Sequence, residues 1–173
     1  MTAYLSAVPA VRFALFILLL CFAAGAQANL TLLFPYAPVT GRPDLVLTLC
    51  LLPALLSDAA GGCGWGFGAG LVSAALTGQT VGSLLVSRTV AGYVAGGFGE
   101  RFVRSHPVVI VGAIAAASLT ADAVYLLCNP PMSLAALLSG ALGAGMNALW
   151  NAALALPLAH LLRRLGWTGS DDD

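Results

Sequence analysis

Two ionisable residues stand inside long apolar stretches, where they could form an ion pair. Arg88 lies near the middle of a helix expected over 80–99, and Asp122 lies toward the end of one expected over 107–128. A charge at the centre of a membrane helix costs about 2.5–3.5 kcal/mol on insertion scales. We therefore expect Arg88 to pair with Asp122, to extend its side chain to the membrane surface, or to face a partner subunit.

Two amides form a second polar feature. Asn147 and Asn151 are four residues apart, beside Trp150, in a helix expected over 134–162. This spacing puts both amides on one helix face. We interpret them as interhelical hydrogen-bonding groups rather than as ligand contacts.

The sequence provides little support for catalysis. His106 and His160 have no second histidine, glutamate or cysteine at the spacing of a metal site. Asp122 stands alone, whereas an aspartyl intramembrane protease needs two membrane-embedded aspartates. We expect no enzyme activity, no catalytic residue, no metal site and no cofactor. The four cysteines are scattered in apolar surroundings and are interpreted as small buried hydrophobic residues: Cys21, Cys50, Cys63 and Cys128.

The composition indicates that these residues belong to a membrane protein. Hydrophobic residues make up 60% of the 173-residue chain and charged residues only 8%, whereas a soluble domain has about 25% charged residues. The formal net charge is zero, so we expect the lipid bilayer as a partner and no nucleic acid.

Six apolar segments predict an all-α polytopic membrane protein, a single bundle of about six short transmembrane helices. The second and third are short for a hydrocarbon core of about 30 Å, so we expect them to be tilted, partly re-entrant or shielded by neighbouring helices. The first could instead be a cleaved signal peptide ending near Ala28, but the apolar run resumes at Leu30, which favours a helix. We expect one transmembrane domain over 1–167 and a polar acidic tail over 168–173. The predicted segments are 10–34, 44–59, 63–78, 80–99, 107–128 and 134–162.

The arginines predict the orientation, because Arg and Lys accumulate in short cytoplasmic loops. Two crossings instead of three between 44 and 99 would put Arg12 across the membrane from Arg101 and Arg104. Six crossings with the N-terminus inside put only Arg42 outside. We therefore expect both termini in the cytoplasm. The arginines expected there are Arg12, Arg101, Arg104, Arg163 and Arg164.

Small residues recur every four positions between 62 and 82, which lays a strip without side chains along a helix face. Such strips let backbones approach closely in lipid, where association relies on van der Waals contact. The strip could pack against another helix of the bundle or receive a helix from a partner. Its members are Gly62, Gly66, Gly70, Ala74, Gly78 and Gly82.

The order of these features resembles the MreD family of rod shape-determining membrane proteins. The resemblance runs from Gln27–Leu33 through Gly41-Arg42-Pro43-Asp44 to Gly66–Leu71, and it continues through Leu76–Gly82 and Gly92-Tyr93. It covers most of residues 10–105. The family commonly has an aspartate shortly after the glycine matching Gly70, where this chain has Ser73-Ala74-Ala75.

The resemblance implies a non-enzymatic component of the bacterial cell-elongation complex in the inner (plasma) membrane, with a role in cell shape and lateral peptidoglycan synthesis. The implied partners are an MreC-like bitopic protein and, indirectly, an MreB-like filament and the cell-wall synthases. The family fold is similar to that of the S-components of energy-coupling-factor transporters, which leaves a substrate-binding transport subunit as the alternative. The candidate residues for helix packing or a partner interface are Pro43, Asp44, Gly66, Phe67, Gly70, Gly78, Gly82, Arg88, Asp122, Asn147 and Asn151.

Overall fold

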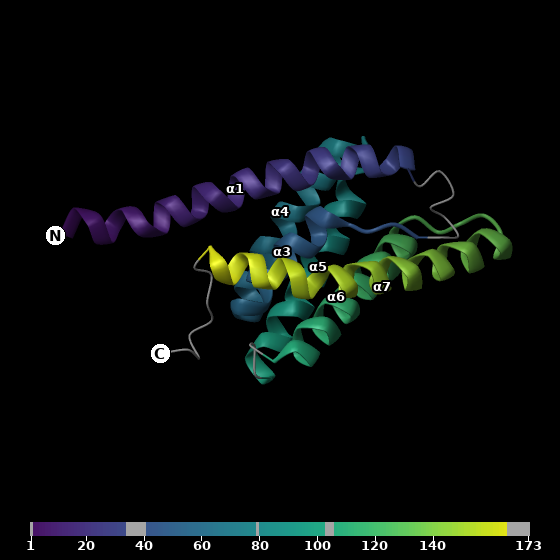
Figure 1. Ribbon diagram of the computed structural model, residues 1–173. Coiled ribbons are helices and arrows are strands. Elements are labelled where there is room, and N and C mark those ends of the chain that lie inside the picture. Colours follow the sequence, from purple (N-terminus) through teal and green to yellow (C-terminus); the bar gives the residue numbers. More distant parts are fainter. Residues whose placement is uncertain (1, 34–40, 79, 103–105, 166–173) are drawn as a thin grey trace.

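The computed structural model describes residues 2–33, 41–78, 80–102 and 106–165, and all regular structure within them is helical (Figure 1). The all-α prediction is confirmed, and most helix ends fall within a few residues of the predicted ends. The first helix begins earlier, at Thr2. The predicted acidic tail, 168–173, lies outside the described residues. The helices are α1 (Thr2–Leu33), α3 (Leu45–Leu56), α4 (Ala59–Thr77), α5 (Val81–Arg101), α6 (Pro107–Cys128) and α7 (Leu134–Arg164).

Three helices of the described chain are long and apolar enough to cross a membrane: α1 over Val11–Asn29, α4 and α6. The α1 stretch has a mean hydropathy of 2.0, yet only 11% of it is buried. Its large apolar side chains therefore point away from the protein, as at Leu18 and Phe22. Such a surface suits lipid rather than water. Length and hydropathy do not extend this conclusion to α3, α5 and α7.

Helix α3 is the centre of the bundle and contacts α1, α4, α5, α6 and α7. Every residue from Val46 to Leu55 is buried, Pro53 included. At about 1.5 Å per residue its 12 residues span about 18 Å, less than a hydrocarbon core of about 30 Å. The other helices cover this short element, which is one of the arrangements expected for the second segment.

Helices α4 and α5 pack through glycines. A Cβ added at Gly92 would lie 2.9 Å from the Cα of Gly66, and one added at Gly70 would lie 3.0 Å from the carbonyl oxygen of Leu84. Backbones therefore touch where side chains are missing. Of the two predicted roles for the glycine strip, internal packing is the one observed for its first half.

The second half of the strip behaves differently. Gly78 ends α4 with a φ of 62°, a left-handed conformation that glycine adopts without strain. Nothing lies within 4 Å of a Cβ added at Gly78 or Gly82. The four-residue spacing thus continues past the end of the helix, where it no longer defines one face.

Helix α1 joins the core through one side. Phe16 is buried and meets the ring of Trp65 on α4 edge to face, with ring centroids 5.1 Å apart. The prediction that the cysteines are buried holds for Cys50 alone, because Cys63 is half-buried and Cys21 and Cys128 are exposed. Figure 1 shows α1 and α7 running in opposite directions, so the start of α1 and the end of α7 lie toward the same end of the molecule.

Candidate functional site

The segment Gly41–Asp44, which leads into α3, is non-helical backbone held inside the bundle. Two amides of α7 accept hydrogen bonds from its backbone. The Arg42 N–H donates to Asn147 Oδ1, and the Asp44 N–H donates to Asn151 Oδ1, each at 2.7 Å. Gly41 has a φ of 62°, and a Cβ there would lie 2.9 Å from the Asn147 nitrogen. Glycine therefore permits both the turn and the close approach to α7.

Gln27 on α1 makes two further hydrogen bonds, one to this segment and one to the first residue of α3. Its side-chain Nε2 donates to the Pro43 carbonyl at 3.1 Å, and its Oε1 accepts from the Leu45 N–H at 2.8 Å. Unpaired backbone groups are costly away from water, so non-helical chain is tolerated at membrane depth only where protein or a water-filled space satisfies it. Here α1 and α7 provide those partners from either side.

Asp44 makes two further interactions through its carboxylate. Oδ1 accepts from the Leu47 N–H at 2.9 Å and so caps the N-terminus of α3. Oδ2 lies 2.6 Å from Arg88 Nη2, with side-chain exposures of 18% for Asp44 and 12% for Arg88. The ion pair compensates the charge that an unpaired Arg88 would place inside α5.

Of the three arrangements expected for Arg88, pairing with Asp122 is wrong, because Arg88 pairs with Asp44 and no ion pair joins it to Asp122. Asp122 Oδ2 instead accepts from Asn147 Nδ2 at 3.0 Å. The physical reason is the position of Asp44: a carboxylate at the start of the central helix faces α5 while capping its own helix.

The two amides of α7 have the interhelical role predicted for them. Asn151 Nδ2 donates to Ser118 Oγ on α6 at 3.0 Å, just as Asn147 donates to Asp122 on the same helix. Each amide thus joins α6 to the segment preceding α3, using its donor on one side and its acceptor on the other. Asn151 is fully buried, with 1% exposure.

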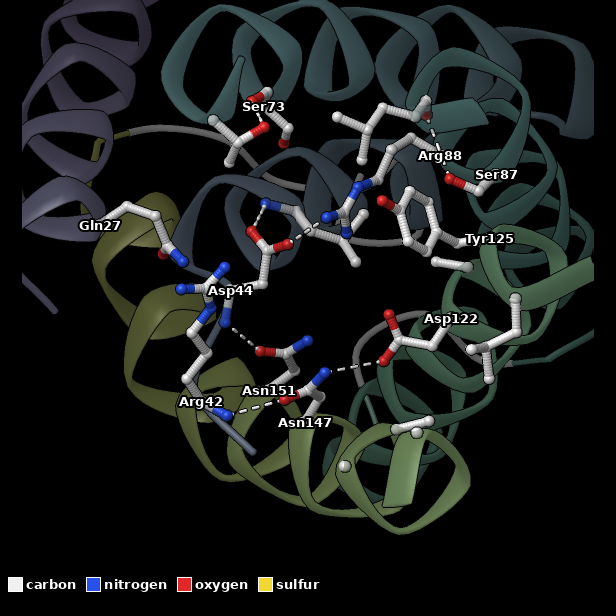
Figure 2. A pocket seen from close by; sticks show the side chains of 18 of the residues that line it. Gln27, Arg42, Asp44, Ser73, Ser87, Arg88, Asp122, Tyr125, Asn147 and Asn151 are labelled. Atoms are coloured by element: carbon white, nitrogen blue, oxygen red, sulfur yellow. Dashed lines mark hydrogen bonds and ion pairs between the residues drawn. The ribbon is translucent and has the colours of Figure 1, made fainter. Parts of the chain in front are cut away.

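These side chains surround a cavity of about 250 Å³. Figure 2 shows polar groups from α1, α5, α6, α7 and the Gly41–Asp44 segment converging on it. Arg88 Nε is buried and has no hydrogen-bond partner. The polar lining consists of Gln27, Arg42, Asp44, Ser73, Thr77, Ser87, Arg88, Asp122, Tyr125, Asn147 and Asn151.

The remaining candidate residues lie elsewhere. Gly66 and Gly70 contact α5 backbone, whereas Phe67 points outward from α4 with 47% exposure. Asn129, which follows α6, accepts a hydrogen bond through Oδ1 from Thr80 Oγ1 at 3.3 Å.

Six of the residues predicted from the sequence are brought together by the fold, and further residues that were not predicted join them. Gln27 was available as a polar side chain inside an apolar span, and Ser118 and Tyr125 belong to the helix that carries Asp122. Their roles depend on which helix faces they occupy relative to α7. The six that come together are Pro43, Asp44, Arg88, Asp122, Asn147 and Asn151.

Within the described ranges, no group of three or more His, Cys, Asp or Glu side chains is arranged to hold a metal ion. Comparison with protein-family models, curated proteins and solved structures found no significant match. The candidate site is therefore defined by its geometry: a polar cavity with an arginine–aspartate pair, set among apolar helices.

Proposed function

We propose that this chain is an MreD-like, non-enzymatic membrane component of a bacterial cell-elongation complex, acting in cell shape and lateral peptidoglycan synthesis. Its direct partner is an MreC-like bitopic protein, through which it meets an MreB-like filament and the cell-wall synthases. The support is the ordered set of sequence features that resembles this family, carried by residues that also organise the bundle.

The observation that carries the proposal is the role of Pro43 and Asp44. This pair belongs to the motif through which the resemblance runs, and in the structure it starts the central helix, accepts from Gln27 and binds Arg88. The glycines of the next motif, Gly66 and Gly70, lie at the α4–α5 contact. The shared features thus coincide with the residues on which this architecture depends.

The proposal includes six crossings of the inner membrane, with both termini in the cytoplasm. Its support is the arginine distribution, together with the 21 residues of α5 and the 31 residues of α7. At about 1.5 Å per residue each spans about 30 Å or more. Helix α3 is too short to cross by itself, and the hydrogen-bonded segment Gly41–Asp44 before it provides the remaining length.

The test is co-purification from the native membrane in mild detergent. A tagged chain should recover an MreC-like bitopic protein encoded in the same genome, and depletion of the chain should convert rod-shaped cells into round ones. Recovery of an ATPase and its membrane coupling subunit instead, with unchanged cell shape, would reject the elongation role.

A second candidate is a substrate-binding subunit of a small-solute transporter, which the polar cavity favours. A scaffold does not require a polar cavity inside the bundle, whereas a solute-binding subunit needs a cavity with precisely placed polar groups. The same co-purification separates the two functions, because the transport subunit must associate with an ATPase module.

A further inference from the structure

We infer that the polar cavity is a binding site for a small zwitterion, a molecule that carries one ammonium group and one anionic group. This goes beyond the proposed function and does not rest on it, since such a ligand could regulate a scaffold or be carried by a transporter.

The charges that line the cavity are the first argument. They comprise two cations, Arg42 and Arg88, and two anions, Asp44 and Asp122. Arg88 and Asp44 neutralise each other at 2.6 Å. Among the described residues neither Arg42 nor Asp122 has an ion-pair partner. The site therefore retains one unpaired charge of each sign.

The unused hydrogen-bonding capacity is the second argument. Arg42 bonds to Asn147 through its backbone N–H, which leaves the guanidinium donors for another partner. Asp122 uses Oδ2 for Asn147, and Figure 2 shows its other oxygen facing the open space. Arg88 Nε is a buried donor without an acceptor.

The unpaired charges and the unused donors together select the ligand class. A partly buried charge or a buried donor without a partner is unfavourable, so the complementary molecule has an anionic group for Arg42 and Arg88 Nε and an ammonium group for Asp122. A simple anion or a simple cation would pair one side only. An uncharged polar molecule would neutralise neither charge.

The size of the cavity limits the ligand. A volume of about 250 Å³ is just below the range of about 300–1,000 Å³ typical of small-molecule sites. It suits a free amino acid or the headgroup of a zwitterionic lipid, with the lipid tails outside. These two sources share the same charge pattern and are separated by experiment.

The test measures thermal unfolding of the purified full-length chain in detergent with two matched sets of probes. L-alanine is compared with propionate and ethylamine, and phosphatidylethanolamine is compared with the anionic lipid phosphatidylglycerol. The zwitterionic member of at least one set should raise the unfolding midpoint in a saturable manner, and the singly charged members of that set should not. Alanine identifies a free solute, and phosphatidylethanolamine identifies a headgroup. No response to either zwitterion, or equal responses within both sets, would overturn the proposal.

Two variants connect the effect to the cavity. Asp122→Asn keeps an acceptor for Asn147 but loses the charge, and Arg42→Gln keeps the backbone bond to Asn147. Each should weaken the zwitterion response by about tenfold or more in half-saturating concentration, the loss expected for one charge-assisted contact. Glu100→Gln is the matched control, because Glu100 accepts from the Ala59 N–H outside the cavity. Unaltered half-saturation in both cavity variants would overturn the site.

Discussion

At the residue scale, Asp44 links three parts of the bundle. Its backbone N–H donates to Asn151 on α7, one carboxylate oxygen caps α3, and the other binds Arg88 on α5. A carboxylate that satisfies a helix N-terminus also interacts favourably with the helix dipole. The arginine that α5 carries is thus accommodated by the start of the central helix rather than by the membrane surface.

The Asp44–Arg88 pair should show strong coupling in a double-mutant cycle. We expect a coupling free energy of about 1–3 kcal/mol between Asp44→Ala and Arg88→Ala, since removing one partner leaves the other largely buried and unpaired. Reversible unfolding in detergent measures it. The cycle of Arg88→Ala with Asp122→Ala is the control, and an equal or larger coupling there would contradict the observed pairing.

Asn151 should be more important for stability than its partner on α6. Asn151→Ala leaves the Asp44 N–H and the Ser118 hydroxyl without their partner, so we expect a loss of about 1–3 kcal/mol. Ser118→Ala removes only the Asn151–Ser118 bond and should cost less. Unfolding free energies of the two variants compare them directly, and a larger loss for Ser118→Ala would contradict the role assigned to the amide.

At the element scale, the α4–α5 contact depends on the faces its glycines occupy. Gly92 meets Gly66 and Gly62 across the contact, while nothing lies within 4 Å of a Cβ added at Gly68 or Gly97 on the same two helices. The same residue type therefore has opposite roles on opposite faces: close backbone packing on one, open surface on the other.

This difference predicts opposite effects of alanine. Gly66→Ala and Gly92→Ala insert a methyl group between touching backbones and should destabilise the protein by about 1–3 kcal/mol. Gly68→Ala and Gly97→Ala should be neutral or stabilising by up to about 1 kcal/mol, because alanine has the higher helix propensity. Melting temperatures of the four variants in one detergent decide this. Equal effects on both faces would show that the packing face is misassigned.

At the scale of the whole molecule, the hydrogen-bonded segment Gly41–Asp44 allows the central helix to be short in a bundle whose other helices are longer. Its backbone bonds go to Gln27 on α1 and to the two amides of α7. The bundle can thus enclose non-helical chain and a polar cavity while presenting apolar side chains outward, such as Leu18 and Leu127.

The proposed six-crossing topology can be tested by cysteine labelling in intact cells. Met132, fully exposed in the α6–α7 connection, is expected on the outer side, and His106 before α6 on the inner side. With Cys128 replaced by alanine, Met132→Cys should react with a membrane-impermeant maleimide. His106→Cys should react only after the membrane is opened. The reverse pattern would invert the orientation, and reaction of both from outside would reject the crossing of α6.

The sequence determined the composition-level properties of this protein. The preference of the surface for lipid, the helix content and most helix ends follow from apolar runs interrupted by Gly, Pro and charged residues. These runs and interruptions are local features. Asn147 and Asn151 were predicted to lie on one helix face, because residues four apart share a face in any helix. The apolar runs also placed Arg88 and Asp122 inside helices.

Only the tertiary structure decided which groups meet. The partner of Arg88 could not be read from the chain, since Asp44 and Asp122 both have a carboxylate that could pair with its guanidinium. The choice between them depends on how α3, α5 and α6 are arranged. The same holds for Gln27, whose two bonds require the Gly41–Asp44 segment to pass beside α1. A cavity is likewise a property of several helices at once. Hydrogen bonds and ion pairs depend on distances of a few ångström between segments far apart in sequence, and local patterns do not specify such distances.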